Sequence, residues 1–259
     1  FTVAIAAAAL IVIAGCAAPS STPEIIAHRG ASHLAPENTL SAVNLAWELT
    51  ADAVEVDVHL SADGRVMVLH DADTERTTGE LYIVSHTPST TLRTLDAGSY
   101  KSAEYAGETI PFLKEVLATV PPGKHLYIEL KSGTDVVPAV AELLQADDEI
   151  RGRCRCIAFD FDAISAAKQA LPDVPCYWLA GSRRDDSTGS FLPHDDTLID
   201  RSLNAGLDGV DVHYGGVTQE FVDAAHRVGM GCFVWTVNDP REFARLSGLG
   251  VDGITTDRP

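Results

Sequence analysis

Apolar and polar residues alternate from Val54 to Val58, with the acids Glu55 and Asp57 between the valines. A strand has a period of two, so the valines face one side and both carboxylates face the other. The Asp-Gly dipeptide at 63–64 predicts a two-residue hairpin turn, and pairing about that turn places His70 opposite Asp57. Taken alone, this stretch fits either an edge hairpin with a solvated polar face or a set of groups for a divalent cation and proton transfer.

A second alternating stretch runs from Leu126 to Lys131. Its leucines and isoleucine share one face of the predicted strand, while Tyr127, Glu129 and Lys131 share the other. An acid and a base are therefore again predicted on a face that should point inward.

Short apolar strands alternate with stretches of helical periodicity through the rest of the chain. The predicted helices cover 40–49, 111–120, 136–144, 163–171, 198–205, 219–228 and 240–246. Strands other than the hairpin's return strand at 66–70 are predicted near residues 26, 55, 128, 158, 177, 211, 234 and 254. Eight strands alternating with helices predict one α/β domain over residues 24–259, a (β/α)8 TIM barrel. The helix expected after the last strand is missing, which favours truncation at this end.

Active sites of such barrels lie at the carboxyl ends of the strands. Six residues fall at those ends, which favours a catalytic cavity over a solvated face: His28, Glu55, Asp57, Glu129, Lys131 and Trp235. His28 and Arg29 are adjacent and cannot both face inward in regular β structure, so we expect the first strand to end and turn there. Residues 72–110 show no sustained period, and we expect an insertion after the second strand that passes over the site.

The charge balance of the 259 residues is strongly acidic, with 37 acids against 19 bases and a net charge of -18. Such a surface repels phosphate backbones, which argues against a nucleic-acid partner. An anionic substrate must therefore be held by a metal ion or by a local basic cluster.

The first fifteen residues carry no charge, and the first charged residue is Glu24. This run is short for a membrane span and typical of a signal-peptide core, with a buried first helix as the alternative. It ends in Ile13-Ala14-Gly15-Cys16, which resembles the lipobox of bacterial lipoproteins. We therefore expect residues 1–23 to be a signal peptide and tether. The starting Met and the basic leader of a signal peptide are absent, so we expect the sequence to be a fragment at this end. The protein is expected to be exported and anchored by lipidated Cys16, either outside the cytoplasmic membrane or in the cell envelope, with no other membrane contact.

Four further cysteines lie in or beside apolar strand candidates: Cys154, Cys156, Cys176 and Cys232. An exported protein can pair such residues as disulfides, but buried free thiols are the favoured interpretation because buried cysteine behaves as a small hydrophobe.

Short motifs along residues 27–257 resemble the glycerophosphodiester phosphodiesterase family in composition and order. They are His28-Arg29-Gly30-Ala31, Pro36-Glu37-Asn38-Thr39, Glu55-x-Asp57-Val58, Asp63-Gly64, His70-Asp71, Arg76-Thr77-Thr78-Gly79, Ala106-Gly107-Glu108-x-Ile110-Pro111, Glu129-x-Lys131, Trp235-Thr236-Val237-Asn238 and Gly250-Val251-Asp252-Gly253. The family fold is a (β/α)8 barrel with an insertion after the second strand, which matches the expectation above.

The resemblance implies roles for seven residues. Glu55, Asp57 and Glu129 would hold Ca²⁺ or Mg²⁺, and His28 and His70 would be the general acid and base. Arg29 and Lys131 would contact the phosphate. Apart from the resemblance, Trp235 shares a strand face with Phe233 and Val237, so we expect it to pack under the substrate, with core packing as the equal alternative. Phe159 is also expected in the substrate pocket.

Three other positions carry expectations. Asn38 is expected to brace its loop through bonds to the backbone. Ala158 and Thr50 stand where the family often has serine and glycine, respectively. The first change removes a hydroxyl, and the second suggests a local backbone difference.

The leading hypothesis is metal-dependent hydrolysis of glycerophosphodiesters to glycerol 3-phosphate and an alcohol. The resemblance implies attack by the glycerol 2-hydroxyl through a cyclic phosphate. One alternative is a lysophospholipase-D-like activity, for which the apolar cluster Leu81–Val84 would have to receive an acyl chain. Another is a non-catalytic phosphodiester-binding surface lipoprotein, against which His28 and His70 argue. The sequence does not specify the oligomeric state.

Overall fold

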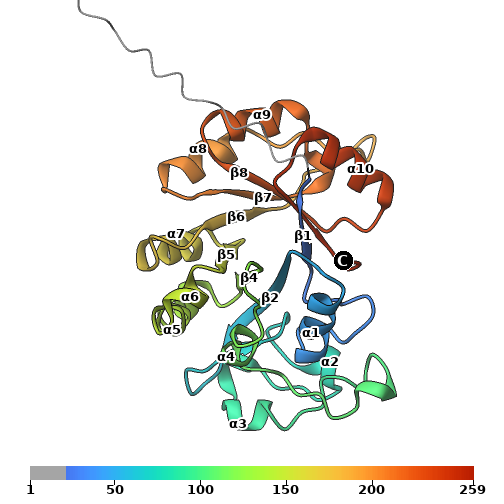
Figure 1. Ribbon diagram of the computed structural model, residues 1–259, viewed down its shortest axis with the longest axis vertical. Coiled ribbons are helices and arrows are strands. Elements are labelled where there is room, and N and C mark those ends of the chain that lie inside the picture. Colours follow the sequence, from blue (N-terminus) through green and yellow to red (C-terminus); the bar gives the residue numbers. More distant parts are fainter. Residues whose placement is uncertain (1–21) are drawn as a thin grey trace, which may run out of the picture.

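Eight parallel strands close into a barrel in the computed structural model, which describes residues 22–259 (Figure 1). The strand order is β1-β9-β8-β7-β6-β5-β4-β2, pairing of β1 with β2 closes the ring, and β3 is an antiparallel addition to β2. The strands are β1 (Glu24–Ala27), β2 (Ala53–Leu60), β3 (Val66–Val68), β4 (His125–Leu130), β5 (Cys154–Ala158), β6 (Cys176–Ala180), β7 (Gly209–His213), β8 (Gly231–Trp235) and β9 (Gly253–Thr256). The predicted TIM barrel is confirmed.

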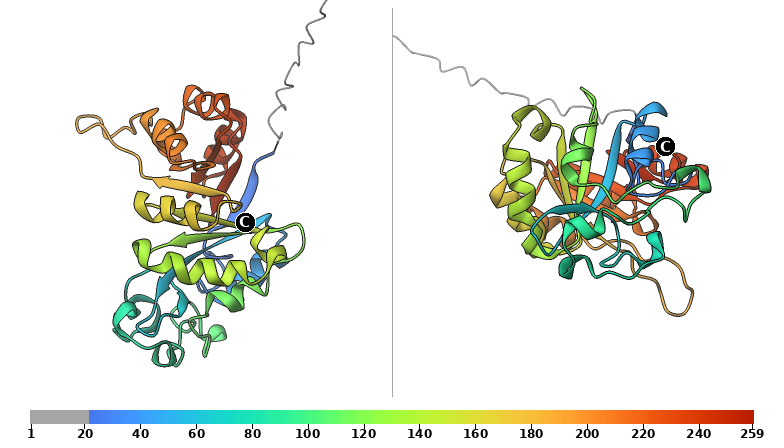
Figure 2. Two further views of the ribbon diagram at one scale, coloured as in Figure 1. Left: turned by 90° about the vertical axis from the view of Figure 1, so that its left-hand side faces the viewer. Right: turned by 90° about the horizontal axis from the view of Figure 1, so that it is seen from below.

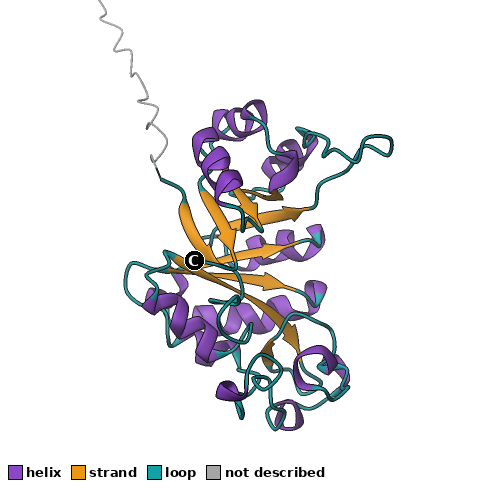
Figure 3. Cartoon of the chain, turned by 90° about the vertical axis from the view of Figure 1, so that its right-hand side faces the viewer, coloured by secondary structure: helices purple, strands orange, loops and turns teal. Residues whose placement is uncertain are grey.

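Helices lie around the strands (Figure 3). The longer ones are α1 (Leu40–Glu48), α5 (Val137–Gln145), α7 (Phe161–Ala170), α8 (Thr197–Asn204), α9 (Gln219–Arg227) and α10 (Pro240–Leu249). The short ones are α2 (Glu75–Thr78), α3 (Ser89–Leu92), α4 (Leu113–Leu117) and α6 (Asp148–Arg151), with 3₁₀ turns η1 (Val84–His86), η2 (Ala103–Tyr105), η3 (Gly133–Val136) and η4 (Tyr214–Gly216). The loop between β6 and α8, residues 181–196, projects from the barrel (Figure 2). None of the helices within residues 22–259 is long and apolar enough to cross a membrane.

The barrel has two apolar layers. Val54, Val56 and Val58 are fully buried in the outer layer between strands and helices, as the alternation predicts. The inner layer fills the barrel with Ile26, Ala53, Tyr127, Ile157, Tyr177, Leu179 and Phe233. The Tyr127 hydroxyl donates to Glu24 at the start of β1 over 2.6 Å, so this layer closes the amino-terminal end of the barrel. Open space for a ligand is left at the carboxyl ends.

The hairpin register differs from the prediction by one residue. Leu60 pairs with Val66, and Ser61 N–H donates to the Arg65 carbonyl over 2.9 Å, so the loop has three residues, 62–64. Gly64 supplies the left-handed position of this turn, with φ 74°. His70 therefore does not pair opposite Asp57. It lies beyond the end of β3, where the chain bends toward the site.

The insertion at 72–110 has short helices, and its Leu92 and Ile110 belong to an apolar cluster that also contains Met67 of β3 and Leu69. It packs against the loop between β1 and α1: Lys101 Nζ donates to the Ser32 carbonyl over 2.6 Å, and the Tyr100 hydroxyl accepts from Glu37 N–H over 3.0 Å. None of the residues that line the cavity at the carboxyl ends of the strands comes from 72–110. Lys101 of the insertion does line a neighbouring cavity together with His28 and Arg29, and the expectation that the insertion passes over the site stays a prediction.

All four cysteines within the described part of the chain are buried and free, as the apolar setting predicts: Cys154, Cys156, Cys176 and Cys232. Cys16 and the rest of residues 1–21 lie outside the described residues.

Candidate active site

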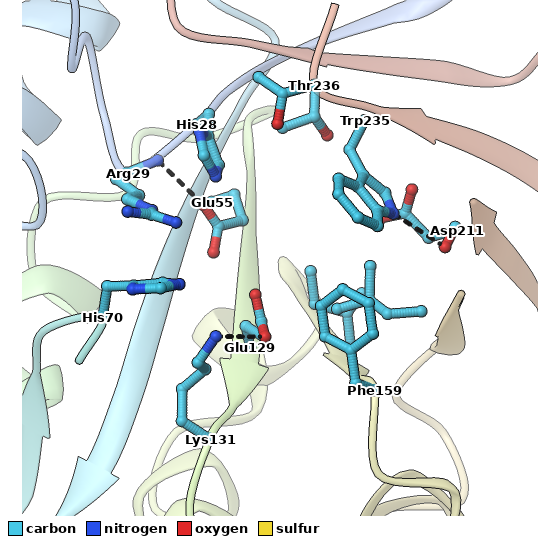
Figure 4. Close-up of a pocket in the computed structure, with 13 residues that line it drawn as sticks. His28, Arg29, Glu55, His70, Glu129, Lys131, Phe159, Asp211, Trp235 and Thr236 are labelled. Atoms are coloured by element: carbon cyan, nitrogen blue, oxygen red, sulfur yellow. Dashed lines mark hydrogen bonds and ion pairs between the residues drawn. The ribbon is translucent and has the colours of Figure 1, made fainter. Parts of the chain in front are cut away.

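A cavity of about 220 Å³ opens at the carboxyl ends of the barrel strands (Figure 4). Charged residues line one side of it, and Phe159, Asp211 and Trp235 line the other. The charged residues are His28, Arg29, Glu55, His70, Glu129 and Lys131. Of the predicted site residues in the barrel, Asp57 alone is missing from this lining, and it lies buried beneath it with no exposed surface.

Three acids form the base of the charged side. One oxygen each of Glu55, Asp57 and Glu129 can be chosen so that all three lie within 4.8 Å of one another. Two buried oxygens of the group, Glu55 Oε1 and Asp57 Oδ1, accept no hydrogen bond from any residue of 22–259. Converging oxygen ligands of this kind suit a hard divalent cation, so the residues present fit such an ion.

The pKa values of these acids report their crowding. Burial, together with the charges of Asp57 and Glu129, raises the pKa of Glu55 well above its usual range. Burial and the charge of Asp57 raise the pKa of Glu129 to about 7. Burial also opposes ionisation of Asp57, but Arg29 and Lys131 outweigh it and lower its pKa. Three carboxylates in one place need more positive charge than these two side chains supply.

Arg29 stands at the point where β1 ends. The strand stops at Ala27, and Arg29 has a left-handed backbone with φ 55°, which confirms that the chain turns there. Its N–H donates to Glu55 Oε2 over 2.9 Å, while its guanidinium Nε lies 3.1 Å from Asp57 Oδ2. Lys131 Nζ lies 2.8 Å from Glu129 Oε1 and 3.5 Å from Asp57 Oδ1. Both cations thus border the acid cluster.

Each of the two histidines is held by an aspartate. His28 Nδ1 lies 2.7 Å from Asp257 Oδ1, and His70 Nδ1 lies 2.7 Å from Asp71 Oδ1. A carboxylate at Nδ1 keeps the proton on that nitrogen and leaves Nε2 as the reactive atom. Both rings point toward the cavity (Figure 4). Burial lowers the pKa of His70, although Asp57 and Asp71 act against it.

The sequence model of the Glycerophosphoryl diester phosphodiesterase family matches residues 28–259. The chain belongs to this family. It is 34% identical over 242 residues to a glycerophosphodiester phosphodiesterase of Caldanaerobacter subterraneus subsp. tengcongensis, covering 91% of this chain and 94% of that protein. It is 31% identical over 241 residues to the enzyme of that name from Bacillus altitudinis, covering 91% and 95%.

Its fold is similar to that of a phosphodiesterase from Oleispira antarctica whose structure contains the product sn-glycerol-3-phosphate. The TM-score is 0.81 and the identity 28%, with 92% of this chain and 94% of that chain covered. The family and its relatives make the chain a glycerophosphodiester phosphodiesterase, a phosphoric diester hydrolase.

One departure from the family pattern leaves the cavity unchanged. Ala158, which stands where the family often has serine, is fully buried in the outer apolar layer. Its neighbour Phe159 does line the cavity, with its ring 5.4 Å from that of Trp235 in an edge-to-face contact. Trp235 Nε1 donates to the Asp211 carbonyl over 3.2 Å. Phe159 and Trp235 thus both line the cavity, and their contact with a substrate stays a prediction.

Asn38 does more than brace its loop. Its Nδ2 donates to Asp57 Oδ2 over 2.8 Å, and its Oδ1 accepts from the Asp57 N–H over 3.1 Å. The side chain therefore fixes both the backbone and one carboxylate oxygen of Asp57. The expected bond to the backbone is present, although it reaches Asp57 of β2, and the bond to the Asp57 carboxylate adds a contact that the sequence did not predict; Asn38 itself has a left-handed backbone with φ 59°.

Sequence reasoning gave no role to several charged residues that surround these groups. Arg76 links Glu37, at 2.8 Å, to Asp71, at 2.5 Å, and Glu37 also accepts from Arg29 over 2.8 Å. Glu37, Asp71 and Arg76 lie within the family-like motifs of the sequence, and this membership could have marked them as site residues. No such motif marked Asp257 or Asp211.

Proposed function

We propose that the chain hydrolyses glycerophosphodiesters to glycerol 3-phosphate and an alcohol, by divalent-cation-dependent chemistry with His28 and His70 as general acid and base. The observation that carries the proposal is one cavity that combines three converging acids, two basic side chains and two histidine–aspartate pairs. Family membership supplies the substrate class.

The charge of the substrate explains the basic residues. A phosphodiester is anionic and resists attack by a nucleophile, so its charge must be neutralised first. Arg29 offers a planar fork of donors, and Lys131 offers a point charge on the other side of the acid cluster. Both side chains can turn from their carboxylate partners to phosphate oxygens once those carboxylates have another positive partner.

That partner would be Ca²⁺ or Mg²⁺ held by Glu55, Asp57 and Glu129. When bound, the ion would neutralise charge on the phosphate and lower the pKa of a nearby hydroxyl. Asn38 would keep Asp57 oriented for this task through its two hydrogen bonds.

Proton transfer would fall to the histidines. Nε2 of one histidine would take the proton from the glycerol 2-hydroxyl. Nε2 of the other histidine would donate a proton to the departing alcohol. The 2-hydroxyl is adjacent to the ester carbon, so its attack on phosphorus is intramolecular and has a large effective molarity. Water would then open the resulting cyclic phosphate.

Two rival functions receive less support. A lysophospholipase-D-like activity needs room for an acyl chain, but the cavity of about 220 Å³ is smaller than the roughly 300–1,000 Å³ of most drug-sized sites. Leu81 and Ile83, which would have to receive the chain, are exposed and lie outside the cavity lining. A receptor that only binds phosphodiesters has no need for two histidines held by aspartates.

The test is release of glycerol 3-phosphate from a panel of deacylated phospholipids, with added Ca²⁺ or Mg²⁺ and with excess chelator. We expect turnover that the chelator abolishes. A 2-deoxy analogue of glycerophosphocholine should be a poor substrate. Comparable turnover of the two compounds would mean that water attacks directly.

We also propose that the protein is exported and anchored through lipidated Cys16, on the basis of the lipobox-like Ile13-Ala14-Gly15-Cys16. A Cys16→Ala form expressed with a full leader should leave the membrane fraction. Its retention there would contradict the anchor.

A further inference from the structure

One carboxyl group in the cavity has no part in the chemistry proposed above. Asp211 is the central residue of β7, and its neighbours Val210 and Val212 pack in the outer apolar layer. Asp211 therefore points into the barrel, where its register partners are Leu179 and Phe233 of the inner layer. It lines the cavity but is only 2% exposed.

This carboxyl group lacks the partners that the other site acids have. Its Oδ1 is buried and accepts no hydrogen bond in the described residues. Burial and the negative charge of Glu129 raise the pKa of Asp211 to about 8, without a nearby cation to oppose them. A buried polar group that is left unpaired destabilises the folded state. An acid retained there at such a cost is a candidate for binding a group that arrives from outside.

Its position separates it from the phosphate-binding side. Asp211 lies beside Trp235, across the cavity from Arg29, His70 and Lys131 (Figure 4). Phe159, on the same side, is 48% exposed and marks the mouth, whereas Asp211 lies at the enclosed end. The bond from Trp235 Nε1 to the Asp211 carbonyl fixes the indole next to the acid.

The chemistry of the substrate class matches this geometry, given the proposed function. All glycerophosphodiesters share the glycerol phosphate half, and only the esterified alcohol differs. An enclosed end suits the constant half, and an open mouth suits the variable one. With phosphorus held near Arg29 and Lys131, and with the 2-hydroxyl next to it, the terminal C1 hydroxyl is the polar group of the glycerol half that reaches farthest across the cavity.

We propose that Asp211 binds the C1 hydroxyl of the glycerol half and thereby selects substrates in which that hydroxyl is free. A protonated carboxyl group both donates and accepts a hydrogen bond, as a hydroxyl does, so the two groups satisfy each other without a charge. A lysophospholipid carries its acyl ester at this position. The ester has no proton to donate, and its chain would have to displace the buried Leu179 and Phe233 of the inner layer, so Asp211 would exclude acylated substrates.

The test measures binding and turnover with a pair of ligands that differ only in this hydroxyl. The dissociation constants of glycerol 3-phosphate and of its 1-deoxy analogue, propane-1,2-diol phosphate, are measured by calorimetry with wild type and Asp211→Leu in the presence of Mg²⁺ or Ca²⁺. We expect wild type to bind the analogue about tenfold more weakly or worse, and Asp211→Leu to bind both within about twofold. Asp211→Asn, whose amide also donates and accepts, should keep part of the discrimination.

Turnover of the corresponding ethanolamine diesters gives the second measurement, and it separates the two proposals. Discrimination in binding without turnover would reject the proposed hydrolysis and leave the role of Asp211 standing. Turnover with equal binding of the two ligands by wild type would reject the role of Asp211 alone. A loss of preference for ethanolamine over ethanol esters in Asp211→Leu would assign the acid to the head group and overturn the proposal.

Stability distinguishes this role from a structural one. Leucine has the same branching at Cγ as aspartate, its larger bulk can extend into the cavity, and it removes an unpaired buried polar group, so Asp211→Leu should unfold at the wild-type denaturant midpoint or above it. A lower midpoint with unchanged discrimination would show that Asp211 serves the fold. If Asp211→Leu does not fold, Asp211→Asn decides: weaker discrimination than that of wild type supports the role of Asp211, and unchanged discrimination rejects it.

Discussion

His28 Nδ1 lies 2.7 Å from Asp257 Oδ1, although 229 residues separate them in the sequence. The contact joins the end of β1 to the residue that follows β9, the neighbouring strand of the barrel. Asp257 also accepts from Asn238 Nδ2 over 2.6 Å and from Ser32 Oγ over 3.1 Å. Burial opposes its ionisation, but the bond and charge of His28 outweigh it and hold the pKa of Asp257 below its usual range. The carboxylate is thus set to orient one tautomer of His28.

Asp257→Asn should lower kcat by about 10²-fold or more, with a much smaller change in KM, because an amide can also favour the wrong tautomer of His28. Ser32→Ala is the matched control: it removes one hydrogen bond from Asp257 but keeps the carboxylate, so kcat should stay within about threefold of wild type. Steady-state kinetics of the two variants gives the answer. Equal effects of both substitutions would contradict an orienting role for the charge.

His70→Ala should lower kcat by about 10²- to 10⁴-fold without unfolding the protein, because the side chain sits at the cavity and outside the apolar layers. The wild-type profile of kcat/KM against pH should be bell-shaped, with its acid limb below the usual histidine range if His70 is the base, since burial lowers its pKa. The exposed His86 of η1 provides a control substitution that should leave the rate unchanged. Near wild-type turnover of His70→Ala would refute the assignment.

The acid cluster predicts a pH dependence of stability. The pKa of Glu129 rises from 4.5 to about 7 on folding, so between these values the folded chain binds more protons than the unfolded chain. In chelator, the free energy of unfolding should therefore fall as the pH rises through this window, by on the order of 2 kcal/mol from this group. Added Ca²⁺ or Mg²⁺ should abolish the fall, because the ion binds the charged form.

Denaturant titrations at pH 5 and pH 7.5 measure this effect. The difference between wild type and Glu129→Gln isolates Glu129 from the other ionisable groups, and the variant should be the less pH-sensitive of the two. A wild-type free energy that is independent of pH in chelator and unaffected by either cation would contradict the proposed ion site.

Strand periodicity predicted the barrel and the inward face of the acids, because each rests on a local rule. Val54–Val58 can alternate in only one sense once the valines are buried. Alternation does not predict the hairpin register. Asp63 accepts hydrogen bonds from Ser61 Oγ and from Ser89, which hold a three-residue loop, and Ser89 belongs to the insertion. Contacts between distant segments decided that turn.

The same distinction explains which site residues the sequence revealed. The positions of Glu55, Glu129 and Lys131 in the site were predicted from the alternation of residues along their strands and from their place at the strand ends. Asp257 and Asp211 were missed because their importance comes from neighbours on other strands: Asp257 next to His28, and Asp211 within an otherwise apolar inner layer. No local pattern marks an aspartate that lacks a partner.

The core of the insertion offers a stability test. Leu92 is fully buried there with Met67 and Leu69, next to His70 in sequence. Leu92→Ala should reduce the free energy of unfolding by about 2–5 kcal/mol and should also lower kcat, since the same cluster supports the segment that carries His70. Leu81, in the same insertion, is 61% exposed, and Leu81→Ala should change stability by less than about 0.5 kcal/mol. Similar denaturation midpoints for both variants would mean that the insertion has no core of its own.

Thr50, which stands where the family usually has glycine, has a strained left-handed backbone at the end of α1. α1 ends at a Schellman motif, in which Thr50 N–H donates to the Trp47 carbonyl over 3.0 Å and Ala51 N–H donates to the Ala46 carbonyl over 3.1 Å. This motif requires a left-handed residue, and Thr50 has φ 68°. Glycine adopts that conformation without steric cost, whereas a β-branched residue is strained by about 1–2 kcal/mol.

Thr50→Gly should therefore raise the free energy of unfolding by about 0.5–1 kcal/mol, the relief of strain being partly offset by the greater freedom of glycine in the unfolded chain. Thr50→Ala is the matched control, because alanine loses the β-branch but still has a Cβ that opposes positive φ, and its stability should stay closer to wild type. Asparagine, which tolerates this conformation, should fall between the two. Urea titrations of the three variants measure the order directly. If alanine stabilised the protein as much as glycine, the β-branch rather than the left-handed backbone would be the source of the strain.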